Sequence, residues 1–342
     1  MTDYMTAYGF TTPQLDGGHP PIEKHSIPVP VPEKRQILVK VKAVSLNPTD
    51  IATWSRKKES DDSLTILGRD VSGTVVSTGS DVTLFKEGDD VFYPGSSNIQ
   101  GAQADFHVID ERMVSLKPKN LTHSEAAALP LTALTSYEVI HDRLSLLSQS
   151  ENPKDTILLI VGAAGGVGSI ACQIALNYGF TVIGTASREE SANHVKNLGV
   201  KHVINHKEPF EEQLKAIGFE TVDAILLAAK ADDNINEAAE VIRPQGSVCS
   251  LLPLKDPLPL SFFSKSISFS YELMYTRSVY ETSDWIKQHE YLIELKNQVE
   301  QGFIQSTLTK HYSEMNEHTL IEAYKELMSD QTLGKIVLEH SS

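Results

Sequence analysis

The sequence has little cysteine, no long apolar run and no excess of positive charge, and each absence excludes a class of protein. Only Cys172 and Cys249 occur in 342 residues, which excludes a disulfide framework and favours a reducing compartment, the cytoplasm. The N-terminal region lacks an apolar signal core, and no apolar run of about 18 residues occurs, so we expect no membrane partner. The net charge of −15 argues against nucleic acid as a partner.

The length and the order of elements predict two domains of the α/β class. A chain of 342 residues is too long for one ordinary core. The first third is rich in predicted strands, at residues 36–44, 71–76 and 90–93. From Thr156 onward, strands alternate with helices, which predicts a doubly wound parallel sheet with strands at 157–161, 181–185, 202–204, 224–228, 247–252 and 266–271.

Helix signals complete this prediction. Thr122-His-Ser-Glu125 and Ser187-Arg-Glu-Glu190 have the spacing of capping boxes, which predicts that helices begin there. The helix that begins after Thr122 is interrupted at Pro130, and a second helical run reaches about Arg143. Later helices are expected near 285–301 and 320–328, with strands near Leu308 and at 334–338.

The most informative stretch is an apolar strand that leads into a glycine-rich turn and a predicted helix over 169–178. The turn consists of Gly162, Ala163, Ala164, Gly165, Gly166, Val167 and Gly168. Glycine lets the backbone approach a pyrophosphate, whose charge the free N–H groups and dipole of the helix hold. Ala163 stands where a strict G-x-G-x-x-G motif has glycine. With the strand before it and the helix after it, the turn predicts a dinucleotide-binding site rather than a purely structural turn.

Motifs in a shared order along nearly the whole chain resemble the medium-chain dehydrogenase/reductase superfamily, on its quinone oxidoreductase side. They are Leu46-Asn-Pro-Thr-Asp50, Gly68-Arg-Asp-Val-Ser-Gly-Thr-Val75, Phe85-Lys-Glu-Gly-Asp-Asp-Val91, Ala126-Ala-Ala-Leu-Pro-Leu-Thr132, the Ala-Ala-Gly-Gly-Val-Gly turn and the closing Gly334-Lys-Ile-Val-Leu338. The chain is particularly similar to bacterial proteins labelled "zinc-type alcohol dehydrogenase-like". The resemblance implies a GroES-like domain at 1–124 and 273–342, an inserted Rossmann domain at 125–272, and a substrate cleft between them.

The residues do not favour zinc, despite that label. A catalytic zinc needs three protein ligands, usually Cys, His or a carboxylate. The resemblance puts Asn47, Arg69 and Leu131 where zinc-dependent relatives carry ligands, and two cysteines cannot form a four-cysteine structural lobe. His202 and His206 are four residues apart on a strand-to-loop segment, where that spacing does not bring the side chains together. We therefore expect no metal, and Arg69 and Asp70 could form an ion pair in its place.

The end of the second strand of the parallel sheet predicts NADPH rather than NADH. An NAD enzyme offers an acid to the ribose 2′-OH there, whereas this chain has Ala186, Ser187 and Arg188. A hydroxyl and a guanidinium bind a 2′-phosphate. Capping by Ser187 and a solvated Arg188 remain the structural alternatives, and Glu189 or Glu190 could instead face the ribose.

The expected reaction is hydride transfer to a quinone or an α,β-unsaturated carbonyl, which stabilises incoming negative charge without a metal. The resemblance places Asn47 and Thr135 near the nicotinamide ribose and carboxamide, and His206 near the adenosine. Asn47, Asp50 and Tyr93 are the candidates for a catalytic role, although Asp50 could merely hold its turn and solvent could supply the proton. An apolar substrate wall would draw on Trp54, Phe92, Tyr93, Met274 and Tyr275.

Two alternatives stay open at this point. One is a zinc-dependent alcohol dehydrogenase, and the other is an NADPH-binding sensor or scaffold without turnover, because a cradle indicates binding and not chemistry. In either case, the β-leaning run at 266–271 predicts a sheet edge at which two chains could pair as a homodimer.

Overall fold

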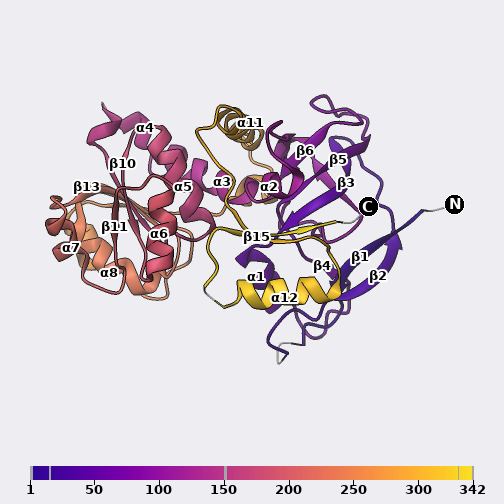
Figure 1. The fold of residues 1–342 in the computed structure, drawn as a ribbon, viewed down its shortest axis with the longest axis horizontal. Coiled ribbons are helices and arrows are strands. Elements are labelled where there is room, and N and C mark those ends of the chain that lie inside the picture. The colour runs from indigo at the N-terminus through magenta and orange to yellow at the C-terminus, as the bar shows by residue number, and fades with distance from the viewer. Residues whose placement is uncertain (1–2, 15–16, 150–151, 330, 341–342) are drawn as a thin grey trace. The chain divides into compact units, whose positions relative to one another are not determined.

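The computed structural model describes residues 3–14, 17–149, 152–329 and 331–340, and the chain divides into two compact units (Figure 1). The first consists of Met1–Leu131, Tyr275–Gly302 and Ser306–Ser342, and the second of Thr132–Met274 and Phe303–Gln305. Helix α2 (His123–Ala127) packs on strands of the first unit, so the division falls after Leu131 rather than before Glu125. The α/β class is confirmed.

Two sheets form the first unit. Strand β1 (Tyr4–Phe10) pairs antiparallel with β2 (Glu23–Pro28) and with β4 (Thr65–Ile66). The larger sheet has the order β15-β16-β3-β5-β6-β8, and β7 pairs with β3. Its strands are β3 (Gln36–Ser45), β5 (Val71–Thr78), β6 (Asp90–Tyr93), β7 (Phe106–Asp110), β8 (Ser115–Leu116), β15 (Leu308–Tyr312) and β16 (Lys335–Glu339). The parallel pair β15–β16 comes from the C-terminal part of the chain, which returns to pair with β3.

The first unit also contains helices α1 (Pro48–Arg56), α10 (Thr276–Val279), α11 (Lys287–Glu300) and α12 (Glu317–Leu327). The capping box at Thr122–Glu125 is confirmed, because each of the two residues bonds the backbone N–H of the other at the start of α2. The sequence had indicated only a turn at residues 47–50, where α1 begins. Pro48 suits the first helical position, and Asp50 accepts the Asn47 N–H at 2.9 Å.

The second unit is built on a six-stranded parallel sheet in the order β11-β10-β9-β12-β13-β14. Its strands are β9 (Ile157–Val161), β10 (Thr181–Thr185), β11 (His202–Ile204), β12 (Val222–Leu227), β13 (Ile242–Ser250) and β14 (Ser268–Tyr271). The connecting helices are α5 (Gly166–Asn177), α6 (Glu189–Asn197), α7 (Phe210–Ala216), α8 (Ala231–Val241) and α9 (Leu260–Ser264). Helix α3 (Pro130–Tyr137), a π-helical turn (Glu138–Arg143) and α4 (Leu146–Gln149) precede β9.

The apolar strands were predicted better than the polar or short ones. Strands β9, β10 and β11 have the predicted bounds, and β9 is the continuous apolar run expected of a strand that is covered on both faces of a parallel sheet. The prediction missed β2, whose residues are partly polar and exposed, and also the largely buried β1 and the alternating buried and half-buried β7. Strand β13 begins at Ile242, earlier than predicted, because Pro244 and Gly246 hide its start. No helix in the described part of the chain is long and apolar enough to cross a membrane.

A buried Tyr–His pair joins β6 to β7. The rings of Tyr93 and His107 stack with centroids 5.6 Å apart, and the Tyr93 hydroxyl lies 3.1 Å from His107 Nδ1. His107 Nε2 lies 3.0 Å from the carbonyl of Gln100, which can only accept, so Nε2 carries the proton and Nδ1 accepts from Tyr93. Burial lowers the pKa of His107 to about 4, so this imidazole is neutral at pH 7.

We expect the first unit to lose stability as the pH falls from 6.5 towards 4, because His107 must become charged. In that window the unfolded chain binds a proton at this histidine and the folded chain does not, so acid favours unfolding. The contribution is about 2 to 3 kcal/mol over the window. Urea unfolding at pH 7 and pH 4.5 should show a smaller acid loss for His107→Gln than for the wild type; equal losses would contradict the assignment.

Candidate dinucleotide-binding site

The glycine turn after β9 is fastened to the end of β10. Gly162 has a φ of +82°, a left-handed conformation that favours glycine. Its N–H donates to the Thr185 hydroxyl at 3.1 Å, and the Ala163 N–H donates to the Thr185 carbonyl at 3.2 Å. The turn is therefore held rigidly at the carboxyl edge of the parallel sheet, which is where doubly wound folds bind ligands.

The start of α5 suits an anion. The helix begins at Gly166, closer to the turn than predicted, and its N-cap Gly165 provides no side-chain cap. The first turn holds no acidic residue, so its N–H groups and the helix dipole meet no negative side chain there. A Cβ on Gly165 would meet only the Gly162 oxygen, at 3.5 Å, and would otherwise project into open space. The arrangement fits a pyrophosphate in front of Gly165.

Gly168 has a different role from Gly165. A Cβ at Gly168 would lie 2.2 Å from the Gly162 oxygen and 2.6 Å from the Ala163 Cα. Helix α5 therefore approaches the end of β9 so closely that only glycine fits. The sequence pattern predicted both glycines without separating these two functions.

Positive side chains follow three neighbouring strands of this sheet: Arg188 after β10, Lys207 after β11 and Lys230 after β12. The half-buried Arg188 is the N-cap of α6, and its N–H donates to Ser191 Oγ at 3.2 Å. The predicted capping box at Ser187–Glu190 is therefore wrong, because the helix begins one residue later and leaves Ser187 outside it. Glu189 and Glu190 are exposed in the first turn of α6.

His206 connects this rim to the glycine turn. Its Nδ1 lies 3.2 Å from the Thr185 hydroxyl, which already accepts the Gly162 N–H and so has its proton left to donate. Burial lowers the pKa of His206, and Lys230 and Lys207 lower it further. These two exposed lysines therefore lie near the His206 imidazole, and neither was among the predicted site residues.

A buried cluster of charges occupies the first unit around Asn47. Lys335 donates to the Leu46 carbonyl at 2.8 Å, to Asp70 Oδ2 at 2.9 Å and to Asn47 Oδ1. The Asn47 amide nitrogen donates to Asp70 Oδ2 at 2.9 Å and to the Arg69 carbonyl. Lys335 can only donate and Asp70 can only accept when ionised, so the amide orientation is unambiguous and every polar atom of the Asn47 side chain is engaged.

A second ion pair completes this cluster. Asp50 accepts the N–H groups of Asn47 and Gly68, each at 2.9 Å, and lies 3.5 Å from Arg69 Nη1. The expected pair between Arg69 and Asp70 is wrong, because Arg69 pairs with Asp50 and Asp70 pairs with Lys335. Burial raises the pKa of both aspartates, while the two cations and the N–H donors oppose that shift.

The positions expected to carry zinc ligands do come together, but with the wrong groups. Asp70 accepts from the Asn47 amide and, at 2.5 Å, from the Leu131 N–H, and Arg69 is its neighbour in the chain. An amide, a guanidinium and an alkyl chain do not form a zinc site. In the ranges that the structure describes, no three His, Cys, Asp or Glu side chains are grouped so that they could hold a metal ion. The residues present do not fit zinc.

The remaining candidate residues are buried. Thr135 lies on α3 with 5% exposure, and the Tyr93 hydroxyl points to His107. The Tyr275 hydroxyl lies 3.2 Å from the Thr49 hydroxyl, and the Arg69 guanidinium lies 5.9 Å from the Tyr275 ring centre. The five side chains expected to face the substrate are each at most 4% exposed: Trp54, Phe92, Tyr93, Met274 and Tyr275.

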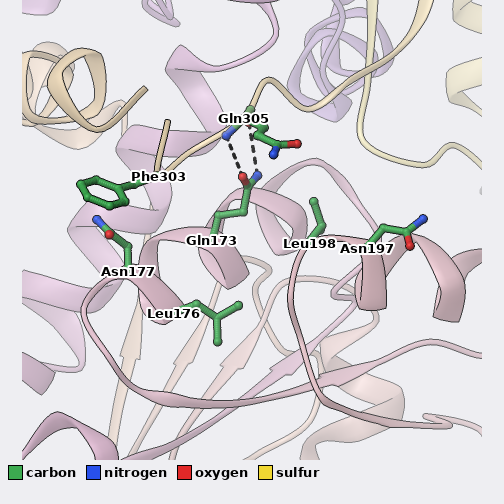
Figure 2. Close-up of a pocket in the computed structure, with 7 residues that line it drawn as sticks. All are labelled: Gln173, Leu176, Asn177, Asn197, Leu198, Phe303 and Gln305. Carbon is green, nitrogen blue, oxygen red and sulfur yellow. Dashed lines mark hydrogen bonds between the residues drawn. The ribbon is translucent and has the colours of Figure 1, made fainter. Parts of the chain in front are cut away.

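A pocket of about 270 Å³ in the second unit lies away from the glycine turn (Figure 2). Gln173 points towards Gln305 in Figure 2, and its Oε1 accepts the Gln305 N–H at 2.8 Å. The lining residues belong to the C-terminal ends of α5 and α6 and to the segment near Phe303: Gln173, Leu176, Asn177, Asn197, Leu198, Phe303 and Gln305. Because the glycine turn meets the opposite end of α5, this pocket is not part of the dinucleotide cradle.

Comparisons with known proteins match both units. The family model "Alcohol dehydrogenase GroES-like domain" matches residues 33–119, and "Zinc-binding dehydrogenase" matches residues 166–288. A zinc-type alcohol dehydrogenase-like protein from Staphylococcus epidermidis is 38% identical over 98% of this chain and 99% of its own. The human quinone oxidoreductase is 32% identical over 66% of this chain and 67% of its own.

Solved structures agree with these matches. A Rhizobium etli protein described as a "putative zinc-dependent alcohol dehydrogenase" superposes with a TM-score of 0.94 at 38% identity, and all of both chains is covered. The Escherichia coli quinone oxidoreductase complexed with NADPH shares the fold, with a TM-score of 0.78 at 24% identity over 98% of this chain and 99% of its own. This chain therefore belongs to the medium-chain dehydrogenase/reductase superfamily of oxidoreductases, with a GroES-like unit, a Rossmann-type unit and quinone oxidoreductases among its relatives.

Proposed function

We propose that this chain is an NADPH-dependent, zinc-independent oxidoreductase that transfers a hydride to a quinone or an α,β-unsaturated carbonyl. The observation that carries the proposal is the uncapped N-terminus of α5, open in front of Gly165 and close to a rim of positive side chains. A bound nicotinamide would supply the hydride, and the protein would hold and orient it. The human relative named quinone oxidoreductase supports the choice of acceptor.

The preference for NADPH rests on positive charge that follows β10, β11 and β12. Arg188, Lys207 and Lys230 would attract a 2′-phosphate, and the Ser187 hydroxyl precedes the helix that Arg188 caps. The exposed Glu189 and Glu190 would repel the 2′-phosphate only if their loop turned towards the ribose. The Escherichia coli relative was solved with NADPH, which agrees with this proposal. His206 would lie beside the adenosine.

We infer zinc independence from what fills the buried cluster. All three N–H bonds of the Lys335 ammonium have acceptors there, so a cation is already part of the structure. Without a metal to polarise an alcohol, an acceptor that stabilises incoming charge by conjugation is the better substrate. A zinc-dependent alcohol dehydrogenase is the alternative that metal analysis would reveal.

In this proposal, the candidate catalytic residues hold the structure around the site and do not transfer a proton. Asn47 and Asp50 hold the start of α1, and the Tyr93 hydroxyl is committed to His107. None of these groups has a free proton to give, which favours solvent as the proton source. Thr135 would contact the nicotinamide ribose or carboxamide, and the substrate wall would include Trp54, Phe92, Tyr93, Met274 and Tyr275.

The proposal also includes a cytoplasmic homodimer. Strand β14 is the last strand of its sheet, and Leu260, Phe263 and Tyr271 nearby are 83%, 85% and 52% exposed. A second copy pairing along β14 would cover this edge. The two buried free thiols suit a reducing compartment. A solution mass equal to one chain would contradict the dimer.

We expect metal-stripped protein to bind NADPH more tightly than NADH and to oxidise NADPH when a quinone is added. Arg188→Ala should weaken NADPH binding about tenfold, the equivalent of 1.4 kcal/mol, and change NADH binding less than twofold. Lys201→Ala, which removes a positive charge at the other end of β11, is the matched control.

These titrations separate the competing functions. Equal losses for both nucleotides in Arg188→Ala would contradict the 2′-phosphate site, and no binding of either nucleotide would contradict the cradle. Tight NADPH binding without turnover on a panel of quinones and enones would favour the sensor or scaffold alternative.

Alanine at the two glycines of the turn should separate binding from stability. Gly165→Ala should change the unfolding free energy by at most about 1 kcal/mol, because its φ of −77° suits alanine and its Cβ meets open space. It should nevertheless weaken NADPH binding at least tenfold, since the methyl group fills the place proposed for the pyrophosphate. Gly168→Ala should destabilise the fold by about 1 to 3 kcal/mol or more. Unchanged NADPH affinity in a folded Gly165→Ala would contradict the cradle.

Removal of Lys335 tests the metal-free cluster. Lys335→Met should destabilise the protein by about 3 to 5 kcal/mol, because Asp70 is left as an uncompensated buried charge. The double variant Lys335→Met/Asp70→Asn should recover much of that loss, as measured by urea unfolding. One tightly held zinc per wild-type chain, or an equal loss in both variants, would contradict this assignment.

A further inference from the structure

The ends of the parallel strands form one row along the sheet. Val161, Leu227, Ser250 and Tyr271 are the last residues of β9, β12, β13 and β14, and successive members are register partners. The residue after each member lies at the same carboxyl edge. Gly162 therefore opens the glycine turn at β9, and Glu272 occupies the matching place three strands away, a spacing of about 14 Å.

Glu272 is a buried carboxylate at this edge. It is 3% exposed, and its N–H donates to the Ser250 carbonyl at 3.0 Å, which fixes its backbone at the end of β13. Its Oε2 accepts from Arg143 Nε at 2.6 Å. Arg143 lies at the end of the π-helical turn Glu138–Arg143, an irregularity that is frequent at functional sites. The ion pair with Arg143 neutralises the charge of the Glu272 carboxylate and holds Oε2 in place.

The other oxygen has no partner. Glu272 Oε1 is enclosed by the protein and accepts no hydrogen bond from any residue that the structure describes. A buried carboxylate oxygen that accepts no hydrogen bond lowers the stability of the fold. Such oxygens are rare in native proteins, so this one needs an explanation. Among the described residues, Arg143 is the one cation that pairs with the Glu272 side chain, and it takes only the other oxygen.

A bound dinucleotide would supply the missing donor. In a doubly wound sheet the first half of a dinucleotide lies over β9, β10 and β11, and the second half extends over β12, β13 and β14. The nicotinamide end carries a carboxamide whose NH2 offers two N–H donors and has no negative charge. A carboxylate accepts hydrogen bonds at both of its oxygens, so Oε1 can take such a donor while Oε2 keeps Arg143.

We propose that Glu272, held by Arg143, accepts a hydrogen bond from the nicotinamide carboxamide and so fixes which face of the ring is presented for hydride transfer. The inference rests on the proposed use of NADPH and adds a side chain that positions the cofactor. It assigns a purpose to the unsatisfied oxygen and to the ion pair that orients it.

The test compares NADP⁺ with its 3-acetylpyridine analogue, in which an acetyl group replaces the carboxamide and removes both N–H donors. Calorimetric titration of the wild type should give at least tenfold weaker binding of the analogue. Glu272→Gln can turn its oxygen towards Arg143 and its NH2 towards the cofactor, so it should lose affinity for NADP⁺ and gain relative affinity for the analogue. The ratio of the two affinities should shift at least tenfold.

Two controls isolate the effect. Glu240→Gln, an exposed glutamate on α8, should leave the ratio unchanged. The fragment 2′-phospho-ADP-ribose, which has no nicotinamide, should bind the wild type and Glu272→Gln equally.

The outcomes distinguish this inference from the proposed function. Wild type that binds neither NADP⁺ nor the fragment would overturn the proposed function. Binding of both, with the same ratio in Glu272→Gln as in the wild type, would overturn only the role of Glu272. If Glu272→Gln fails to fold, the wild-type comparison decides alone, and equal affinity for NADP⁺ and the analogue would overturn the inference.

Discussion

The ion pair between Asp70 and Lys335 is the interaction on which the first unit depends most. It joins the start of β5 to the first residue of β16, 265 positions later in the chain, and the same carboxylate holds Asn47 and the Leu131 N–H. Both charges are buried, and their desolvation is offset only because each has several polar partners. Four segments distant in sequence are thereby fixed around one carboxylate.

The same cluster fills the positions at which the resemblance led us to expect zinc ligands. Two aspartates and two cations balance one another, with Arg69 on Asp50 and Lys335 on Asp70. Asn47 and Leu131 converge on Asp70 through hydrogen bonds to its carboxylate. Buried networks of this kind are rigid because every member has its partners.

The second unit differs from this cluster, because polar groups at the carboxyl edge of its sheet lack hydrogen-bond partners among the described residues. The helix N-terminus at Gly165 lacks a side-chain cap, and Glu272 Oε1 lacks a donor among the described residues. Both lie at the carboxyl ends of parallel strands, where the backbone stops pairing and its polar groups face outward. Strained or unsatisfied groups at such an edge are typical of a place that a ligand completes.

The sequence by itself determined the parallel sheet, the glycine turn and the superfamily, because continuous apolar runs and glycine at close approaches are local requirements. The start of α1 at Pro48 follows local signals, Pro48 and the Asn47–Asp50 box, that were interpreted only as a turn, whereas the start of α6 after Arg188 depends on which side chain bonds the free backbone N–H groups. Only the tertiary structure decided that Arg69 pairs with Asp50, that Lys335 pairs with Asp70, and that Glu272 Oε1 accepts no hydrogen bond from the part of the chain that the structure describes. Those partners come from segments far apart in the chain, and hydrogen bonding between buried charges is decided by position in space.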